Sequence, residues 1–152
     1  MAIGVGVLVA VVWIATLLIA NPQPPTKEEA AAKIEEHFDR IEGSLSAGSI
    51  LDRSEEIAEE ACPLEGLGDQ TRVQRVLYVA PDLDRIAWAT TLREVFTEAD
   101  GWAVRVKTLD SRENLGIRIA GRDLTVISIT ATDASGDARV TLLSTSECSR
   151  TS

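Results

Sequence analysis

Few side chains in this 152-residue chain could carry out chemistry, and the sulfur atoms come first among them. Cys62 and Cys148 are the two cysteines, and His37 is the one histidine. Two thiols are too few for a tetrahedral zinc site unless His37 and a carboxylate complete the ligand set. A Cys62–Cys148 disulfide would close a loop of about 86 residues, worth roughly 4–5 kcal/mol in the chain-entropy model. We therefore expect this disulfide, which persists only outside a reducing cytosol; two unrelated cytoplasmic thiols are the alternative.

An acidic cluster provides the second candidate site. Glu55, Glu56, Glu59 and Glu60 would form two like-charge i,i+4 pairs on a helix. Carboxylates grouped in this way could hold a calcium or other divalent ion. The segment lacks the Asp-x-Asp-x-Asp-Gly spacing of a calcium loop, and a solvated helix face explains the residues without a ligand. We therefore predict no metal site.

His37 is the residue best suited to proton transfer near neutral pH. It could act as a general base or as a pH switch. It lies among Glu35, Glu36 and Asp39 on the edge of an amphipathic segment. We expect a partly exposed helix residue there and no catalytic role.

The remaining motifs do not complete an active site. The segment Gly43–Gly48 (GSLSAG) lacks the G-x-S-x-G register of a nucleophile elbow. Asp82 and Asp84 could form a catalytic pair, but the start of a helix attracts carboxylates anyway, and Asp82 is placed to cap one. P-loop and dinucleotide fingerprints do not occur. We predict no catalytic residues, no cofactor and no enzymatic activity.

An apolar run at the N-terminus indicates where in the cell the chain resides. Residues 2–20 (AIGVGVLVAVVWIATLLIA) hold no charged side chain. As a helix, the run would be about 28 Å long, close to the roughly 30 Å thickness of a bilayer's hydrocarbon core. We predict a transmembrane anchor over residues 1–20, with the membrane as its partner, and a stiff Pro-rich linker over residues 21–25 (NPQPP).

Two other interpretations of this run compete with an anchor: a cleaved signal peptide and a buried helix of a soluble protein. No Lys or Arg precedes the run, and Leu18 would stand at the −3 position of a cleavage after Ala20, so a signal peptide fits poorly. For an anchor, Lys27 and Lys33 favour a cytoplasmic C-terminal part by the positive-inside rule. The expected disulfide favours the extracytoplasmic side, and we give it more weight.

Three helices are predicted after the linker. Thr26 and Glu29 form a capping box that begins the first, which reaches about Glu42. Residues 50–61 form a second, weaker helical stretch, and residues 83–99 form a third. The first helix has one apolar stripe at spacings of three and four: Ala30, Ile34, Phe38, Ile41 and Leu45.

Most of the remaining chain has the pattern of strands separated by turns. The expected strands span residues 71–80, 102–107, 115–119, 124–132 and 138–146. The resulting order predicts an α+β fold, with an N-terminal transmembrane helix followed by helices packed on one face of a mostly antiparallel sheet. Residues 26–152 would form this single extracytoplasmic domain.

Charge is distributed unevenly along the chain, whose net charge is −9. Residues 27–69 hold four basic and thirteen acidic residues, whereas residues 70–152 hold equal numbers of each. This acidic balance argues against nucleic acid as a partner. An anionic membrane surface would repel the acidic part, which favours an upright domain.

The C-terminal half has a pattern that resembles a known family. A helix carrying Trp88 and Leu92 ends in Asp100-Gly101-Trp102, hairpins follow around Gly121 and Gly136, and the last strand leads into Thr145-Ser146-Glu147-Cys148. This resembles small membrane-anchored and secreted actinobacterial proteins of the mycobacterial LppA lipoprotein type. The resemblance implies a short α+β domain and an extracytoplasmic location, but no reaction and no site residues. The chain lacks the lipidated cysteine of those lipoproteins, so the helix itself would be the anchor.

The sequence therefore predicts a single-pass membrane protein with an extracytoplasmic C-terminal domain. Its expected role is non-enzymatic binding of an envelope component or another envelope protein. One version of this role is a phage- or prophage-encoded protein that hinders superinfection. An unrecognised envelope hydrolase that uses a Glu or His37 and a cytoplasmic-facing protein with free thiols are the alternatives.

Overall fold

The computed structural model describes residues 26–64, 67–110, 113–134 and 136–148. Strands make up 47% of this part and helices 23%, so the sheet dominates the structure. The predicted anchor at residues 1–20 and linker at residues 21–25 lie outside the described residues. Within the described residues, no helix has the length and apolar character needed to span a bilayer.

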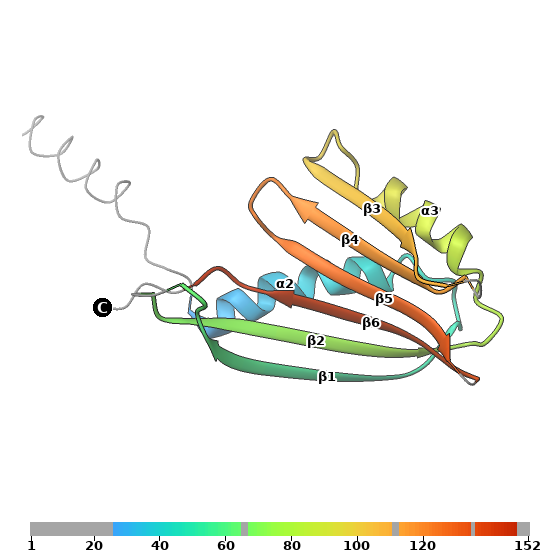
Figure 1. The fold of residues 1–152 in the computed structure, drawn as a ribbon, viewed down its shortest axis with the longest axis horizontal. Helices are drawn as coiled ribbons and strands as arrows, with labels where there is room; N and C mark the ends of the chain where they lie inside the picture. The colour runs from blue at the N-terminus through green and yellow to red at the C-terminus, as the bar shows by residue number, and fades with distance from the viewer. Residues whose placement is uncertain (1–25, 65–66, 111–112, 135, 149–152) are drawn as a thin grey trace, which may run out of the picture.

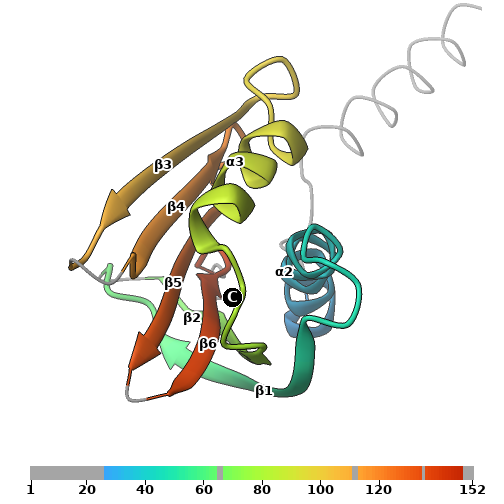
Figure 2. The same cartoon turned by 90° about the vertical axis from the view of Figure 1, so that its right-hand side faces the viewer.

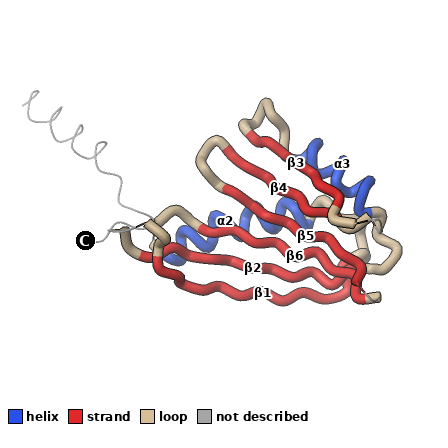
Figure 3. Tube along the Cα trace, viewed as in Figure 1, coloured by secondary structure: helices blue, strands red, loops and turns tan. Residues whose placement is uncertain are grey.

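The described residues form two helices and six strands (Figures 1 and 3). The helices are α2 (Lys27–Glu42) and α3 (Arg85–Val95). The strands are β1 (Ile50–Ala61), β2 (Asp69–Val79), β3 (Trp102–Thr108), β4 (Leu115–Gly121), β5 (Val126–Ala134) and β6 (Asp137–Thr145).

All six strands form one antiparallel sheet in the order β1-β2-β6-β5-β4-β3. β1 and β2 form a hairpin, β3 to β6 form a meander, and the pairing of β2 with β6 joins the two. Both helices lie on the same side of the sheet (Figure 2). One face is therefore covered and the other is open, and β1 and β3 are the two edge strands.

Helix α2 begins and ends where the sequence predicts. The Thr26 hydroxyl accepts a hydrogen bond from the Glu29 N–H at 3.2 Å, and the Glu29 carboxylate accepts one from the Thr26 N–H at 2.9 Å. These reciprocal bonds satisfy two backbone donors that the first helical turn cannot pair. The helix ends at Gly43, and all five residues of the predicted apolar stripe are buried.

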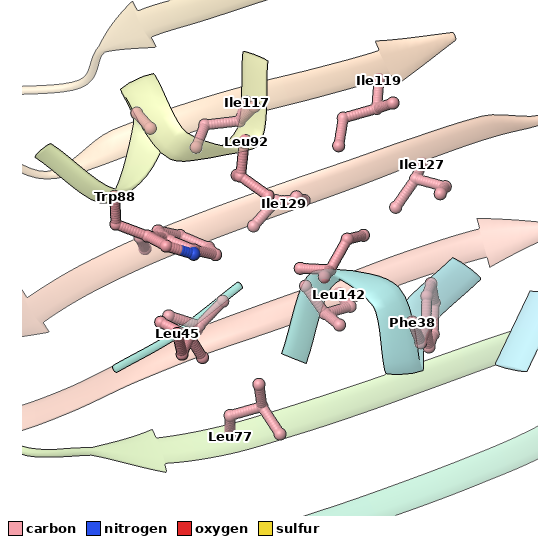
Figure 4. Close-up of a cluster of buried hydrophobic side chains, with 14 of the residues drawn as sticks. Phe38, Leu45, Leu77, Trp88, Leu92, Ile117, Ile119, Ile127, Ile129 and Leu142 are labelled. Atoms are coloured by element: carbon pink, nitrogen blue, oxygen red, sulfur yellow. The ribbon is translucent and has the colours of Figure 1, made fainter. Parts of the chain in front are cut away.

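The hydrophobic core fills the space between the helices and the covered face of the sheet (Figure 4). Strand residues on this face alternate with residues on the open face, as the period of two requires. Phe38 of α2 and Trp88 and Leu92 of α3 supply the large side chains from the helical layer. The sheet contributes Val73, Leu77, Ile117, Ile119, Ile127, Ile129, Val140 and Leu142, each at most 2% exposed.

The predicted fold class is wrong because residues 50–61 form strand β1 instead of a helix. The protein is mainly β, a six-stranded antiparallel sheet with two helices. Glu and Ala favour helix locally, but β1 pairs with β2 along nearly its whole length. This long-range pairing, together with cations placed on both faces, outweighs the local preference.

Helix α3 is shorter than predicted at both ends. Asp84, and not Asp82, is its N-cap, and its carboxylate accepts a hydrogen bond from the Ala87 N–H at 2.8 Å. The helix ends at Val95 because Phe96 has left helical geometry, with φ −110° and ψ 87°. Phe96 is still buried, whereas Ala99, at the predicted end of this helix, is exposed.

Candidate functional site

The structure joins Cys62 and Cys148 in a disulfide, as predicted, with their Cα atoms 5.6 Å apart. Cys62 follows β1 and Cys148 follows β6, and these strands flank β2 in the sheet. The bond therefore spans the start of β2 and ties the hairpin to the last strand. The predicted helix over residues 50–61 would place Cys62 at a helix end, whereas in the structure Cys62 follows strand β1.

The acidic cluster of the sequence is dispersed by the strand geometry. Glu55 and Glu59 face the helices, whereas Glu56 and Glu60 face the open side. Glu55 bonds Arg75 at 2.6 Å, Glu59 meets Lys27 at 3.2 Å, and Glu60 meets Arg72 at 2.7 Å. Across the described ranges, no three side chains of the metal-binding types are grouped to hold an ion.

Arg75 is the centre of the largest charged network and was not singled out from the sequence. Its side chain is 6% exposed on the covered face of β2. It donates to Asp39 at 2.6 Å, to Glu42 at 3.1 Å and to Glu55 at 2.6 Å. Burial alone would lower the pKa of the Arg75 guanidinium, but its hydrogen-bonded carboxylates raise that pKa above the usual value. The network fastens the C-terminal half of α2 to the β1–β2 hairpin.

A hollow of about 470 Å³ opens beside this network, between the end of α2 and the start of β1. Asp39, Glu42 and Arg53 contribute its charged wall, and the segment Gly43–Gly48 contributes its rim. The Arg75 guanidinium bonds Asp39 and Glu42, and Arg53 approaches Glu42 at 3.4 Å. The carboxylates are therefore engaged in ion pairs, an arrangement that suits a structural contact better than general acid–base catalysis.

His37 is half-buried on α2, packed edge-on against the Trp102 ring at 4.9 Å. Its buried Nε2 atom has no hydrogen-bond partner in the described structure. Burial lowers the pKa of His37 below 6.5, although the charges of Asp123 and Glu36 oppose this effect. A neutral imidazole packed on an indole fits a structural role.

An ion pair between Lys33 and Asp123 lies beside His37. Lys33 contacts Asp123 at 2.8 Å, and this contact holds the pKa of Asp123 down at about 2. Asp123 lies in the turn between β4 and β5. The pair thus joins the first half of α2 to that turn.

Two cross-strand rows run across the middle of the open face, as the pairing registers show. The first row contains Arg105, Arg118, Ser128, Leu143, Gln74 and Glu56. The second contains Lys107, Gly116, Thr130, Thr141, Val76 and Ser54. With strands about 4.8 Å apart, each row is about 24 Å wide.

Positive charge collects at one end of these rows. We call Arg105, Lys107 and Arg118 the basic pole; all three are exposed. Arg105 lies directly opposite Arg118, a position at which like charges destabilise a sheet. No carboxylate of the described residues forms an ion pair with any of the three.

Negative charge lies at the other end of the open face, on β1. Asp52, Glu56 and Glu60 form this acidic pole. Between the poles lie hydroxyl groups, the half-buried Val76 and Leu143, and two further arginines, Arg72 on β2 and Arg139 on β6. Such a surface can bind an elongated partner through charge at its ends and hydrogen bonds along its middle.

The poles were missed because they depend on strand register, which brings distant residues together. Arg75 left a local signal: it shares the period of two with Val73, Leu77 and Val79, all of which are buried. A charged residue in such a run indicates a buried ion pair.

Comparisons with known proteins show a fold and no family. No family model and no curated protein matches the chain. Among solved structures, the chain is similar to the crystal structure of a DUF4853 family protein from Actinomyces odontolyticus, with 16% identity and a TM-score of 0.51. The alignment covers 86% of this chain and 73% of that chain. At this identity the similarity concerns the fold alone, and the resemblance to LppA-type lipoproteins stays a prediction.

Replacing Arg75 with Ala would leave Asp39, Glu42 and Glu55 without their shared cation. We expect the free energy of unfolding in urea to fall by about 3 kcal/mol, as when one member of a buried ion pair is removed. Arg139→Ala is the matched control, because Arg139 is half exposed and lies 3.8 Å from Asp137. That control should lose less than about 1 kcal/mol. Equal losses would contradict the role of the network.

The His37 environment predicts a pH dependence of stability. Because its pKa is lowered from 6.5, the unfolded chain binds more protons below that pH. The contribution is complete well above pH 6.5, and the free energy of unfolding falls as the pH drops through 6.5. His37→Gln should flatten this part of the profile, and an unchanged slope would contradict it. Asp123 does not interfere, since its contribution is lost only between pH 3.8 and about 2.

Proposed function

We propose that the chain is a membrane-anchored extracytoplasmic protein that binds an envelope partner and has no enzymatic activity. The observation that carries this proposal is the open sheet face with its separated basic and acidic poles. No layer covers this face within the described residues, and no described carboxylate forms an ion pair with the basic pole.

The location is supported by the Cys62–Cys148 disulfide, since such bonds persist mainly in oxidising compartments. The apolar run of residues 2–20 supports a membrane anchor, by its length and its lack of charge. The acidic residues between positions 27 and 69 support an upright domain above an anionic bilayer.

Binding accounts for the described side chains better than hydrolysis does. A hydrolase would need a nucleophile, a base and an oxyanion donor within reach of one substrate atom. The carboxylates beside the hollow are bonded to Arg75, and His37 packs against Trp102 away from it. The open face instead carries opposite charges at its two ends, which can orient a partner of complementary charge.

Site-specific photo-crosslinking in intact cells tests the proposed surface. A photoreactive residue at Thr130, exposed in the middle of the open face, should yield discrete adducts with another envelope protein. The same residue at Glu94, exposed on α3, is the matched control and should not yield them. Arg118→Glu should reduce the Thr130 adducts at least tenfold. Identical adducts from both positions, or adducts from Glu94 alone, would reject the open face as the contact surface.

A further inference from the structure

The two edges of the sheet differ in charge and in length. β1 has 12 residues and β3 has seven, and each is the terminal strand of the sheet. An edge strand presents backbone N–H and C=O groups that can pair with another strand. Proteins usually prevent such pairing with short or charged edge strands. A charged edge can still pair with a strand that carries the opposite charge, so the charge on each edge selects its partner.

The open-face side chains of the edges carry opposite charges. β3 presents Arg105 and Lys107, backed by Arg118 on β4, whereas β1 presents Glu56 and Asp52. Two β3 edges would repel each other, and so would two β1 edges, because like charges opposite each other are destabilising. A β3 edge beside a β1 edge brings opposite charges together.

We propose that β3 of one copy of this chain pairs antiparallel with β1 of a second copy, with Arg105 opposite Glu56. The occupant of the β3 edge is thus another molecule of the same protein. The contact shares Arg105 and Glu56 with the two poles, but it pairs strand edges and requires no envelope partner, so its test can fail without rejecting the open face as a binding surface.

The central pairs of this register are compatible on both faces of the sheet. On the open face, Ala103 lies opposite Ala58 of the second copy, so small side chains allow close approach. On the other face, half-buried Val104 lies opposite Ile57 of the second copy, which is 42% exposed in one copy alone. The contact would thus be stabilised by an apolar pair on one face of the joined sheet and by an ion pair on the other.

The net charge of −9 does not prevent this contact. Charges more than about 8 Å apart are largely screened at physiological salt, so the residues at the edge dominate. The Glu56 carboxylate would also offset part of the positive charge where Arg105 and Arg118 face each other. The contact is head-to-tail, so it leaves one β1 edge and one β3 edge free.

Introduced cysteines test the register in the full-length chain. Two tagged versions, Ala103→Cys and Ala58→Cys, are expressed together and oxidised mildly in intact cells. Residues directly opposite in adjacent strands have Cα atoms about 4.5–5.5 Å apart, within the range of a disulfide. We expect a mixed dimer on a non-reducing gel. Within one copy these positions lie on opposite edges, about 24 Å apart, so the bond forms only between copies.

Two controls make the result decisive. Ser54→Cys in place of Ala58→Cys shifts the thiol about 13 Å along β1 and should give at least tenfold less mixed dimer with Ala103→Cys. Arg105→Glu on the Ala103→Cys chain should lower the dimer tenfold or more, and Glu56→Arg on the other chain should restore it. Absence of the 103–58 dimer, equal dimer from the 103–54 pair, or no rescue by the reversed charges would overturn the proposal.

Discussion

Within the described residues, a sheet of six strands has two helices to cover it, and the rest of the structure follows from this shortage. Apolar side chains must leave water, so every buried strand residue lies on the face toward α2 and α3. The opposite face has no such layer in the described structure and carries hydroxyls and charges. The surface we propose for binding is therefore a direct result of how the core is built.

The same shortage explains why ion pairs supplement apolar packing where the outer strand of the hairpin meets α2. The helix covers β2 well, but its cover ends at β1, where Ile57 stays 42% exposed. At this margin, Arg75 and Lys27 replace apolar contacts with ion pairs to Glu55 and Glu59. The Cys62–Cys148 disulfide adds a covalent tie at the end of the same hairpin. Edge strand β1 is thus fixed by polar and covalent links while its outer edge is available.

The sequence predicts those features that arise from neighbouring residues. The capping box of Thr26 and Glu29, the stripe that includes Phe38 and the positions of β2 to β6 follow from local spacing. The disulfide could be predicted because the chain has two cysteines and each lies beside an ordered element. Strand β1 could not be found in this way, because its Glu and Ala content favours helix and its pairing partner lies further along the chain. The poles could not be found either, because Arg105 and Arg118 meet only through strand register.

The central claim is that the domain folds outside the cytosol around its disulfide, with its open sheet face toward an envelope partner. The most direct test labels intact cells with a membrane-impermeant maleimide, with and without prior treatment by an impermeant reductant. The account predicts that Cys62 and Cys148 are labelled only after reduction. No labelling of intact cells under either condition, together with two free thiols after lysis, would contradict the disulfide and the extracytoplasmic location.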